Sequence, residues 1–175
     1  MDLRKERTKR NIINAFIELR AHKPLERITV KELSEMALIN KATFYSHYKD
    51  VYDLSKQLED ETINSIIMNV SNLDNMIENP RQTTHELVTA FLSQMGLINI
   101  LFSDSRNSVL SSCLEKRFKE IIYEKHPEYN TLEWDVRLTI ILQGSYYAFA
   151  QNYKKYDVTT LSKLIGESSE RMLLE

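Results

Sequence analysis

Glycine and proline are scarce in this chain, with three residues of each among 175. Because both residue types interrupt helices and build tight turns, their scarcity predicts long helices joined by few turns. It also excludes a glycine-rich loop that cradles phosphate, since such a loop needs several glycines close together. The sequence therefore predicts an all-α protein, long enough for one or two small domains with a sizeable core.

Cysteine occurs only once, as Cys113, which excludes an internal disulfide and a metal site built on a cysteine pair. We interpret Cys113 as a small apolar core residue rather than a nucleophile. A single cysteine fits a reducing compartment, and we expect the protein to be cytoplasmic. No apolar run approaches the length needed to cross a bilayer, and the first residues lack an apolar signal segment. We therefore expect no membrane partner.

Residue groups typical of catalysis or metal binding are missing from the sequence. The four histidines lie far apart, and none belongs to a metal-binding motif such as HExxH. Neighbouring acidic residues are interpreted as solvated helix faces rather than acid–base pairs. We therefore expect no catalytic residue, no metal site and no cofactor. A helical-bundle enzyme is one remaining alternative, and turnover of a co-purifying small molecule would support it.

The net charge of −2 conceals an uneven distribution along the chain. Residues 1–49 contain 11 Lys+Arg and 6 Asp+Glu, a net +5, whereas residues 50–175 contain 12 and 19, a net −7. A basic N-terminal part on an acidic remainder favours orientation of the basic part toward phosphates. The alternative interpretation is an ordinary solvated surface. The basic residues before position 11 have the same two interpretations, contact with DNA or a frayed terminus.

Residues 29–47 predict two short helices joined by a tight turn. Thr29 and Glu32 have the spacing of a capping box at the start of the first helix. Asn40 is a suitable N-cap for the second, because its side-chain oxygen can accept a hydrogen bond from the first turn. The two helices together have the form of a helix-turn-helix.

The second short helix, from Lys41 to about Tyr48, has two different sides. Phe44 and Tyr48, four residues apart, are predicted to anchor it to the core. The other side chains are small, hydroxylic or cationic, which are the types that contact bases and phosphates.

At these residues the chain resembles the DNA-binding region of the TetR family of bacterial transcriptional regulators. The resemblance covers about residues 10–58 and rests on Ile28-Thr29-Val30, Ala37, Thr43-Phe44-Tyr45-Ser46-His47-Tyr48 and Leu54. Leu38 and Ala42 stand where the family usually has glycine, so a positive φ at Leu38 would be strained. Val51 stands where the family usually has a phosphate-binding lysine, and Lys49 is its expected substitute.

The resemblance implies an N-terminal three-helix DNA-binding head, residues 1–50, and a C-terminal helical body for ligand binding and dimerisation, residues 51–175. It implies a homodimeric regulator, a repressor released by a small apolar or aromatic effector, that binds a pseudo-palindromic duplex DNA site. The expected base contacts come from Lys41, Ala42 and Thr43. The expected phosphate contacts come from Thr29, Tyr45, His47 and Lys49, and Ser46 belongs to the same DNA-binding surface.

Helical spacing predicts the helices of the body at residues 51–72, 83–95, 97–102, 105–125, 131–153 and 157–173. The family uses a helix like 51–72 as the lever that transmits ligand binding. Helix 131–153 is apolar on several sides, which predicts burial on more than one side. Gly144 and Ala148 would let another helix approach closely. Helices 131–153 and 157–173 are the expected homodimer interface, and an ordinary central core helix is the alternative.

An apolar cavity for the effector is expected between the helices of the body. Its candidate lining residues are aromatic residues and one methionine, namely Phe91, Met95, Phe102, Phe118, Trp134, Tyr146 and Tyr147. Ordinary core packing explains the same residues without a ligand. A second hypothesis for the whole chain is a TetR-like interaction protein that holds a protein partner and has weak or no affinity for DNA. A gel shift against genomic fragments distinguishes the two hypotheses.

Overall fold

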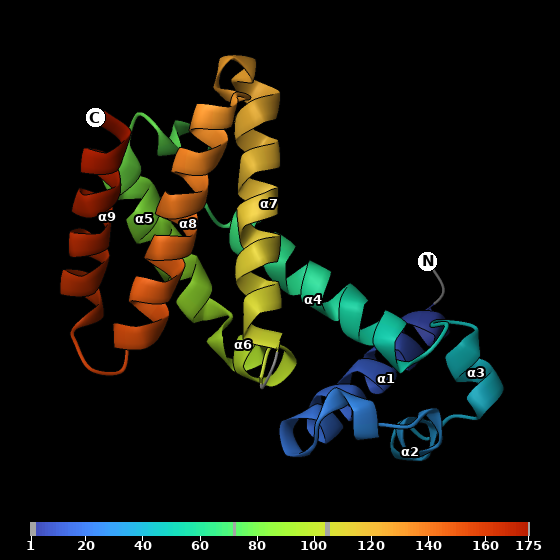
Figure 1. Ribbon diagram of the computed structural model, residues 1–175. Coiled ribbons are helices and arrows are strands. Elements are labelled where there is room, and N and C mark those ends of the chain that lie inside the picture. Colours follow the sequence, from blue (N-terminus) through green and yellow to red (C-terminus); the bar gives the residue numbers. More distant parts are fainter. Residues whose placement is uncertain (1–2, 72, 104–105, 175) are drawn as a thin grey trace. The chain divides into compact units, whose positions relative to one another are not determined.

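The computed structural model of the protein describes residues 3–71, 73–103 and 106–174. Across these residues the chain forms nine α-helices, short 3₁₀ helices and no strand (Figure 1). The prediction of an all-α fold is thereby confirmed. Asn72 and Ser105, which limit two of the predicted helices, lie outside the described residues.

The helices group into two compact units. The N-terminal unit comprises Met1–Thr62 with Gly96–Arg106, and the C-terminal unit comprises Ile63–Met95 with Asn107–Glu175. The predicted domains, residues 1–50 and 51–175, differ from these units in the placement of residues 51–62 and 96–106.

The N-terminal unit contains three helices that precede residue 50, and these pack in chain order, α1 on α2 and α2 on α3. Its elements are α1 (Leu3–His22), η1 (Leu25–Arg27), α2 (Val30–Met36), α3 (Lys41–Tyr45), α4 (Val51–Met68) as far as Thr62, and α6 (Met95–Leu101) from Gly96 onward. Fully buried apolar side chains from four of these helices, among them Ile12, Phe16, Leu33, Phe44 and Leu54, form its core.

The C-terminal unit is built from four long helices. Its elements are η2 (Leu73–Met76), α5 (Pro80–Ser93), α7 (Asn107–Lys125), η4 (Pro127–Tyr129), α8 (Leu132–Asn152) and α9 (Val158–Leu174), with the end of α4. Helix α8 packs against both α7 and α9, and α5 packs against α9 (Figure 1). One apolar cluster surrounds Phe149 and Ile165, and a second surrounds Ile122 and Leu138.

Local hydrogen bonds explain where these helices begin and end. The hydroxyl of Thr131 accepts a hydrogen bond from the Trp134 N–H and begins α8 at the predicted place. Helix α5 begins at Pro80, three residues before the predicted start, because proline suits the first helical position. Helix α4 ends at Met68, before the predicted end, where the Asn69 and Val70 N–H groups donate to the Ile66 and Ile67 carbonyls at 3.3 and 3.1 Å.

None of the helices in the described ranges combines the length and the apolar character that crossing a membrane requires. The same ranges bring no three His, Cys, Asp or Glu side chains together as a metal-binding group.

Candidate nucleic-acid interface and internal cavity

The start of α2 is held by the predicted capping box. Thr29 Oγ1 accepts from the Glu32 N–H at 3.2 Å, and the Thr29 N–H donates to Glu32 Oε2 at 3.1 Å. Lys23 Nζ lies 2.5 Å from Glu32 Oε1. Hydrogen bonds from Lys23 and Thr29 lower the pKa of the Glu32 carboxyl below its usual value. The charged cap fixes the direction in which α2 leaves the preceding loop.

The turn between α2 and α3 depends on a strained residue. Leu38 has a φ of 56°, the left-handed conformation that glycine adopts at least cost. Its side chain is 90% exposed, so little packing compensates for the strain. The Ile39 N–H donates to the Ser34 carbonyl at 2.9 Å and closes the turn. The turn therefore forms with a leucine in the left-handed region.

Helix α3 is anchored on one side and exposed on the other. Phe44 is fully buried and Tyr48 is 3% exposed, as predicted, and their rings lie 5.7 Å apart. Burial, with the charges of Glu61 and Asp53, raises the pKa of Tyr48 to about 12. Five residues are too few for a stable isolated helix, so these two rings hold α3 on the unit.

The predicted DNA-contacting side chains lie on or beside α3 and on the cap of α2. Six are exposed and two are half-buried; the exposed residues are Thr29, Lys41, Ala42, Tyr45, Ser46 and Lys49, and the half-buried ones are Thr43 and His47. The structure therefore leaves most of this set accessible to a large partner.

Three hydroxyls in this set already donate their protons within the protein. Thr43 Oγ1 donates to Asn40 Oδ1 at 2.9 Å, and Ser46 Oγ donates to the Thr43 carbonyl at 2.7 Å. Thr29 Oγ1 donates to Glu32 at 2.9 Å. Since a phosphate accepts hydrogen bonds and donates none at neutral pH, these hydroxyls keep only acceptor capacity for a partner, and the two threonines add a methyl group each. The sequence did not show this, because the spacing of Asn40 and Thr43 indicates a cap without indicating where the hydroxyl proton points.

The cationic and phenolic side chains remain available as donors. Neither Lys41 nor Lys49 makes a side-chain hydrogen bond or ion pair with the described residues, and Tyr45 is 57% exposed. Lys49 is tied to α4 through its backbone, whose N–H donates to Asp53 Oδ2 at 2.9 Å. Val51 is 6% exposed and packs in the core, so Lys49 is the cationic residue next to it on the surface.

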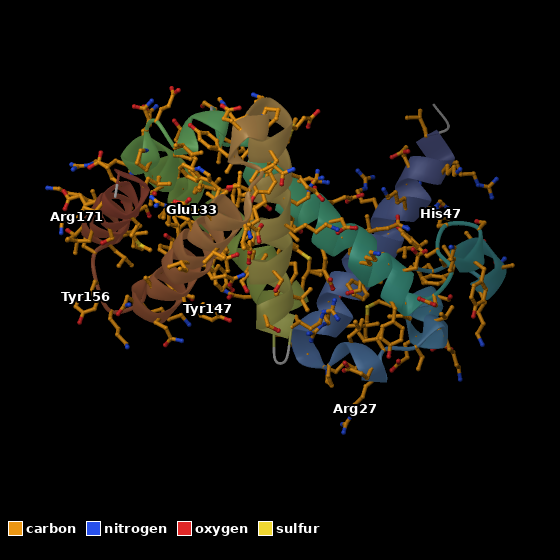
Figure 2. The ribbon with its side chains drawn as sticks, turned by 45° about the horizontal axis from the view of Figure 1, so that its top comes forward. Arg27, His47, Glu133, Tyr147, Tyr156 and Arg171 are labelled. Carbon is orange, nitrogen blue, oxygen red and sulfur yellow. The ribbon has the colours of Figure 1, made fainter. Side chains whose placement is uncertain are left out.

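His47 lies where the end of α3 meets charges from α1 (Figure 2). Burial lowers the pKa of its imidazole, and the nearby charges of Lys5 and Lys9 lower it further, against an opposing contribution from Glu6. Charges at the basic N-terminal end of α1 therefore act on His47 at the end of α3. Lys9 Nζ also lies 3.3 Å from Glu61 Oε1, so part of its positive charge is already compensated within the protein.

A cavity of about 100 Å³ lies inside the C-terminal unit. Helices α5, α7, α8 and α9 contribute most of its wall, which is mainly apolar, and Glu115 and several serines interrupt it. Three of the predicted pocket residues line it, namely Phe91, Phe118 and Tyr146. The rings of Phe91 and Tyr146 meet edge to face, with centroids 6.1 Å apart.

The other four predicted pocket residues do not line this cavity. Met95 packs beside the Phe149 cluster, and the Trp134 ring contacts Tyr129 at a tilt, with ring centroids 4.4 Å apart. Phe102 is fully buried in the N-terminal unit. Tyr147 projects from the outer side of α8 and is 49% exposed (Figure 2). Helical spacing identifies an apolar side chain without identifying which neighbour it meets.

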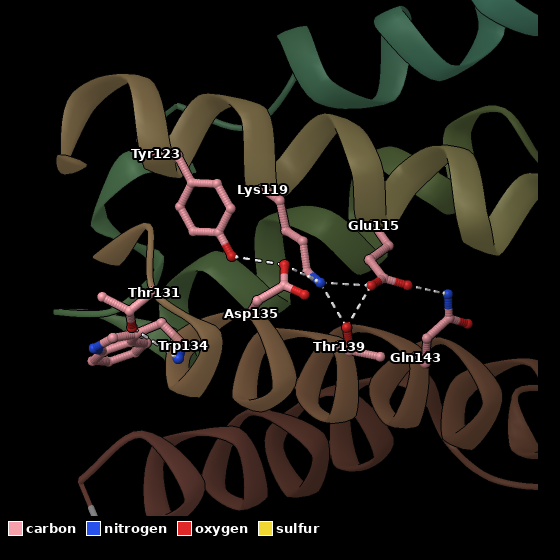
Figure 3. A network of polar contacts seen from close by, with 8 residues as sticks. All are labelled: Glu115, Lys119, Tyr123, Thr131, Trp134, Asp135, Thr139 and Gln143. Atoms are coloured by element: carbon pink, nitrogen blue, oxygen red, sulfur yellow. Dashed lines mark hydrogen bonds and ion pairs between the residues drawn. The ribbon is translucent and has the colours of Figure 1, made fainter. Parts of the chain in front are cut away.

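A polar network that sequence reasoning missed joins α7 to α8 beside the cavity (Figure 3). The Glu115 carboxylate accepts from Thr139 at 2.6 Å, from Gln143 at 2.7 Å and from Lys119 at 2.9 Å. Burial alone would raise the pKa of Glu115, but these hydrogen bonds and the charge of Lys119 outweigh it and lower the pKa to about 2. Lys119 also lies 2.9 Å from Asp135. The sequence indicates this network only through the four-residue spacing of Glu115 and Lys119, which makes the two side chains neighbours on a helix surface.

The outer side of α8 and α9 is apolar and exposed. Its large exposed residues include Val136, Ile140, Tyr147, Leu164 and Met172. A shallow groove of about 280 Å³ lies between the two helices. A Cβ atom added at Gly144 would have nothing within 4 Å, so the backbone of α8 is accessible at that point.

A comparison of the chain with protein-family models finds no match, and a comparison with curated proteins finds none either. The structure and these comparisons thus support an all-helical protein of 175 residues, without a family assignment.

Proposed function

We propose that the protein is a sequence-specific DNA-binding transcriptional regulator of the TetR type, most simply a repressor. The observation that carries the proposal is α3, a five-residue helix held by Phe44 and Tyr48 with Lys41 and Tyr45 turned outward. Such a helix offers base-reading side chains at a surface where an α-helix fits the major groove.

Charge supports this choice of surface. Residues 1–49 carry a net +5, and Lys5 and Lys9 lie close enough to His47 to lower its pKa. In the proposed complex Lys41 and Ala42 contact bases together with Thr43. Thr43 acts as a hydrogen-bond acceptor and a methyl contact, because its proton is directed to Asn40. Tyr45, His47 and Lys49 contact phosphates.

The regulator acts as a homodimer through α8 and α9. Their exposed apolar residues would be costly to leave in water, and a second copy of the same face covers them. A two-fold dimer places two copies of α3 about 34–36 Å apart, one turn of duplex DNA, and so reads a pseudo-palindromic site. A small apolar effector in the C-terminal cavity shifts this spacing, and a coupling of about 1–3 kcal/mol suffices for strong release.

The test is selection of duplexes from a random library by the full-length protein, with sedimentation of the free protein in parallel. The proposal predicts enrichment of two inverted half-sites one helical turn apart and a dimer in solution. Affinity for the enriched site should fall steeply as salt rises, because phosphate contacts release counterions. A library that stays random at low salt would contradict the proposal and favour the interaction-protein alternative.

A further inference from the structure

At the cavity in the C-terminal unit, one hydroxyl proton has no acceptor among the described residues. Ser145 on α8 and Ser169 on α9 face each other with their Oγ atoms 3.2 Å apart, and both border the cavity. Neither hydroxyl makes a further hydrogen bond with any described residue. Since each hydroxyl has one proton and one of the two is donated across the pair, one O–H and several lone pairs remain.

The remaining proton lies in a largely closed environment. Ser169 is 5% exposed, and Ser145 is half-buried. A buried polar group without a partner costs free energy, so such groups normally have one. The pair also borders the groove on the outer side of α8 and α9, which is the other place where its partner can lie.

Part of the cavity wall is aromatic. Phe91 meets both Tyr146 and Phe149 edge to face, with ring centroids 6.1 and 5.7 Å apart. Aromatic rings prefer such offset contacts with further rings. The cavity volume of about 100 Å³ is smaller than the roughly 150 Å³ of an engineered cavity that binds benzene, so a ligand with more than one ring is excluded.

The negative charge at the cavity wall disfavours an acidic ligand. Glu115 borders the cavity as a carboxylate, and with Lys119 and Asp135 it forms a cluster of two negative charges and one positive charge. The Glu115 carboxylate at the cavity wall would repel a carboxylate ligand. An uncharged ligand avoids this repulsion.

We propose that the cavity binds a neutral, single-ring aromatic compound with one hydroxyl or carbonyl oxygen, of the phenol class, and that Ser145 and Ser169 bind this oxygen. The ring lies against Phe91 and Tyr146, and the oxygen accepts the unused serine proton. This inference deepens the effector part of the proposed function by naming the chemical class of the ligand.

The test is a ligand-observed NMR titration of the full-length protein with phenol, toluene and benzoate. Phenol and toluene have nearly the same shape and differ in the hydroxyl, and benzoate adds a negative charge. The variants are Ser145→Ala with Ser169→Ala, and Ser168→Ala as the matched control. Ser168 is exposed and lies on α9 next to Ser169, and its hydroxyl donates to the Leu164 carbonyl of the same helix.

The expected result is saturable binding of phenol that weakens about tenfold in the double variant, the usual consequence of losing one buried hydrogen bond. Toluene affinity should stay the same or increase in that variant, and Ser168→Ala should change neither. Benzoate should not bind. Equal effects of the double variant on phenol and toluene, unchanged phenol affinity, or no phenol binding by the native chain would each overturn the proposal.

The titration contains no DNA, so its failure is distinguishable from failure of the proposed function. If the protein selects a DNA site but does not bind phenol, only the proposed class of ligand is contradicted. If the protein binds phenol but selects no DNA, the proposed function as a DNA-binding regulator is contradicted and the proposed ligand site is not.

Discussion

Arg106 and Glu59 form a short ion pair within the N-terminal unit, with Arg106 Nη2 2.5 Å from Glu59 Oε2. The Glu59 side chain is 6% exposed and also accepts from Ser55 Oγ at 2.7 Å. The pair ties the segment after α6 to α4. Removing one partner of such a pair is costly because the other charge stays buried.

Arg106→Met is therefore expected to lower the free energy of unfolding by about 2–3 kcal/mol. Adding Glu59→Met should recover much of this loss, because no uncompensated carboxylate remains. Urea denaturation of the full-length chain measures both. Arg117→Met is the control, since Arg117 pairs with an exposed Glu120 and should change stability by less than about 0.5 kcal/mol. Equal effects at the two arginines would contradict the burial argument.

Leu38→Gly is expected to stabilise the protein by about 1 kcal/mol, a reversal of the usual effect of glycine. The gain comes from relief of the left-handed backbone at φ 56°, reduced by the greater entropy of glycine in the unfolded chain. Leu38→Ala keeps the Cβ atom and so keeps the strain, which makes it the matched control. Thermal and urea denaturation measure the difference, and similar stabilities for the glycine and alanine variants would exclude strain at this residue.

Two substitutions in α3 should separate base contacts from phosphate contacts. Tyr45→Ala should weaken binding to all sequences by a similar factor, whereas Thr43→Ala should relax preference at one base position by about 1–3 kcal/mol. The measurement is fluorescence anisotropy on the selected site and on single-base variants of it. Met68→Ala, at an 84% exposed position in α4, serves as the control. If neither α3 substitution alters binding, α3 is not the recognition helix.

DNA affinity should rise as the pH falls, through His47. In the free protein burial and the charges of Lys5 and Lys9 lower the pKa of His47 below 6.5. A phosphate favours the imidazolium and raises the pKa in the complex, so binding takes up a proton. Affinity therefore increases on acidification through the interval between the two pKa values, about tenfold for each unit that separates them.

The pH dependence of DNA binding is measured between about pH 8 and pH 5, the range in which histidine titrates. His47→Gln should remove most of the slope. His22→Gln, a change at an exposed histidine at the end of α1, should preserve it. If the DNA affinity of His47→Gln keeps the same dependence on pH, the proton taken up on binding belongs to another group.

Acid should weaken the C-terminal unit through Glu115. Its pKa is about 2 in the folded protein against an ordinary value of 4.5. Above pH 4.5 the Glu115 carboxyl is ionised in both the folded and the unfolded protein, so its contribution to the free energy of unfolding is complete there. This contribution is lost as the pH falls from 4.5 toward 2. The difference in melting temperature between the native chain and Glu115→Gln should shrink over this interval. A constant difference would contradict the lowered pKa.

Sequence reasoning succeeded where the deciding interactions are local. The capping box of Thr29 and Glu32, the Asn40 cap and the burial of Phe44 and Tyr48 all depend on residues three or four positions apart. Apolar spacing likewise predicts α8 and α9, and the observed bounds, Leu132–Asn152 and Val158–Leu174, lie within one residue of the predicted ones. These features follow from helix geometry, in which such neighbours share a face.

The cavity was predictable only in part, because its wall depends on which helices meet. Phe118 and Phe102 are both buried aromatic residues, yet only Phe118 lines the cavity. The Ser145–Ser169 pair joins two helices across 24 positions, and neither serine differs in sequence from an ordinary solvent-facing one. Contacts of this kind are fixed by tertiary packing.

The most direct test of the central claim is hydrogen–deuterium exchange of the full-length protein with and without duplex DNA at low salt. A short helix such as α3 exchanges quickly when free. DNA binding through α3 predicts slowed exchange at residues 41–49 and at the N-terminal end of α1, and little change on α8 and α9. Unchanged exchange at residues 41–49 in the presence of bound DNA would contradict the account.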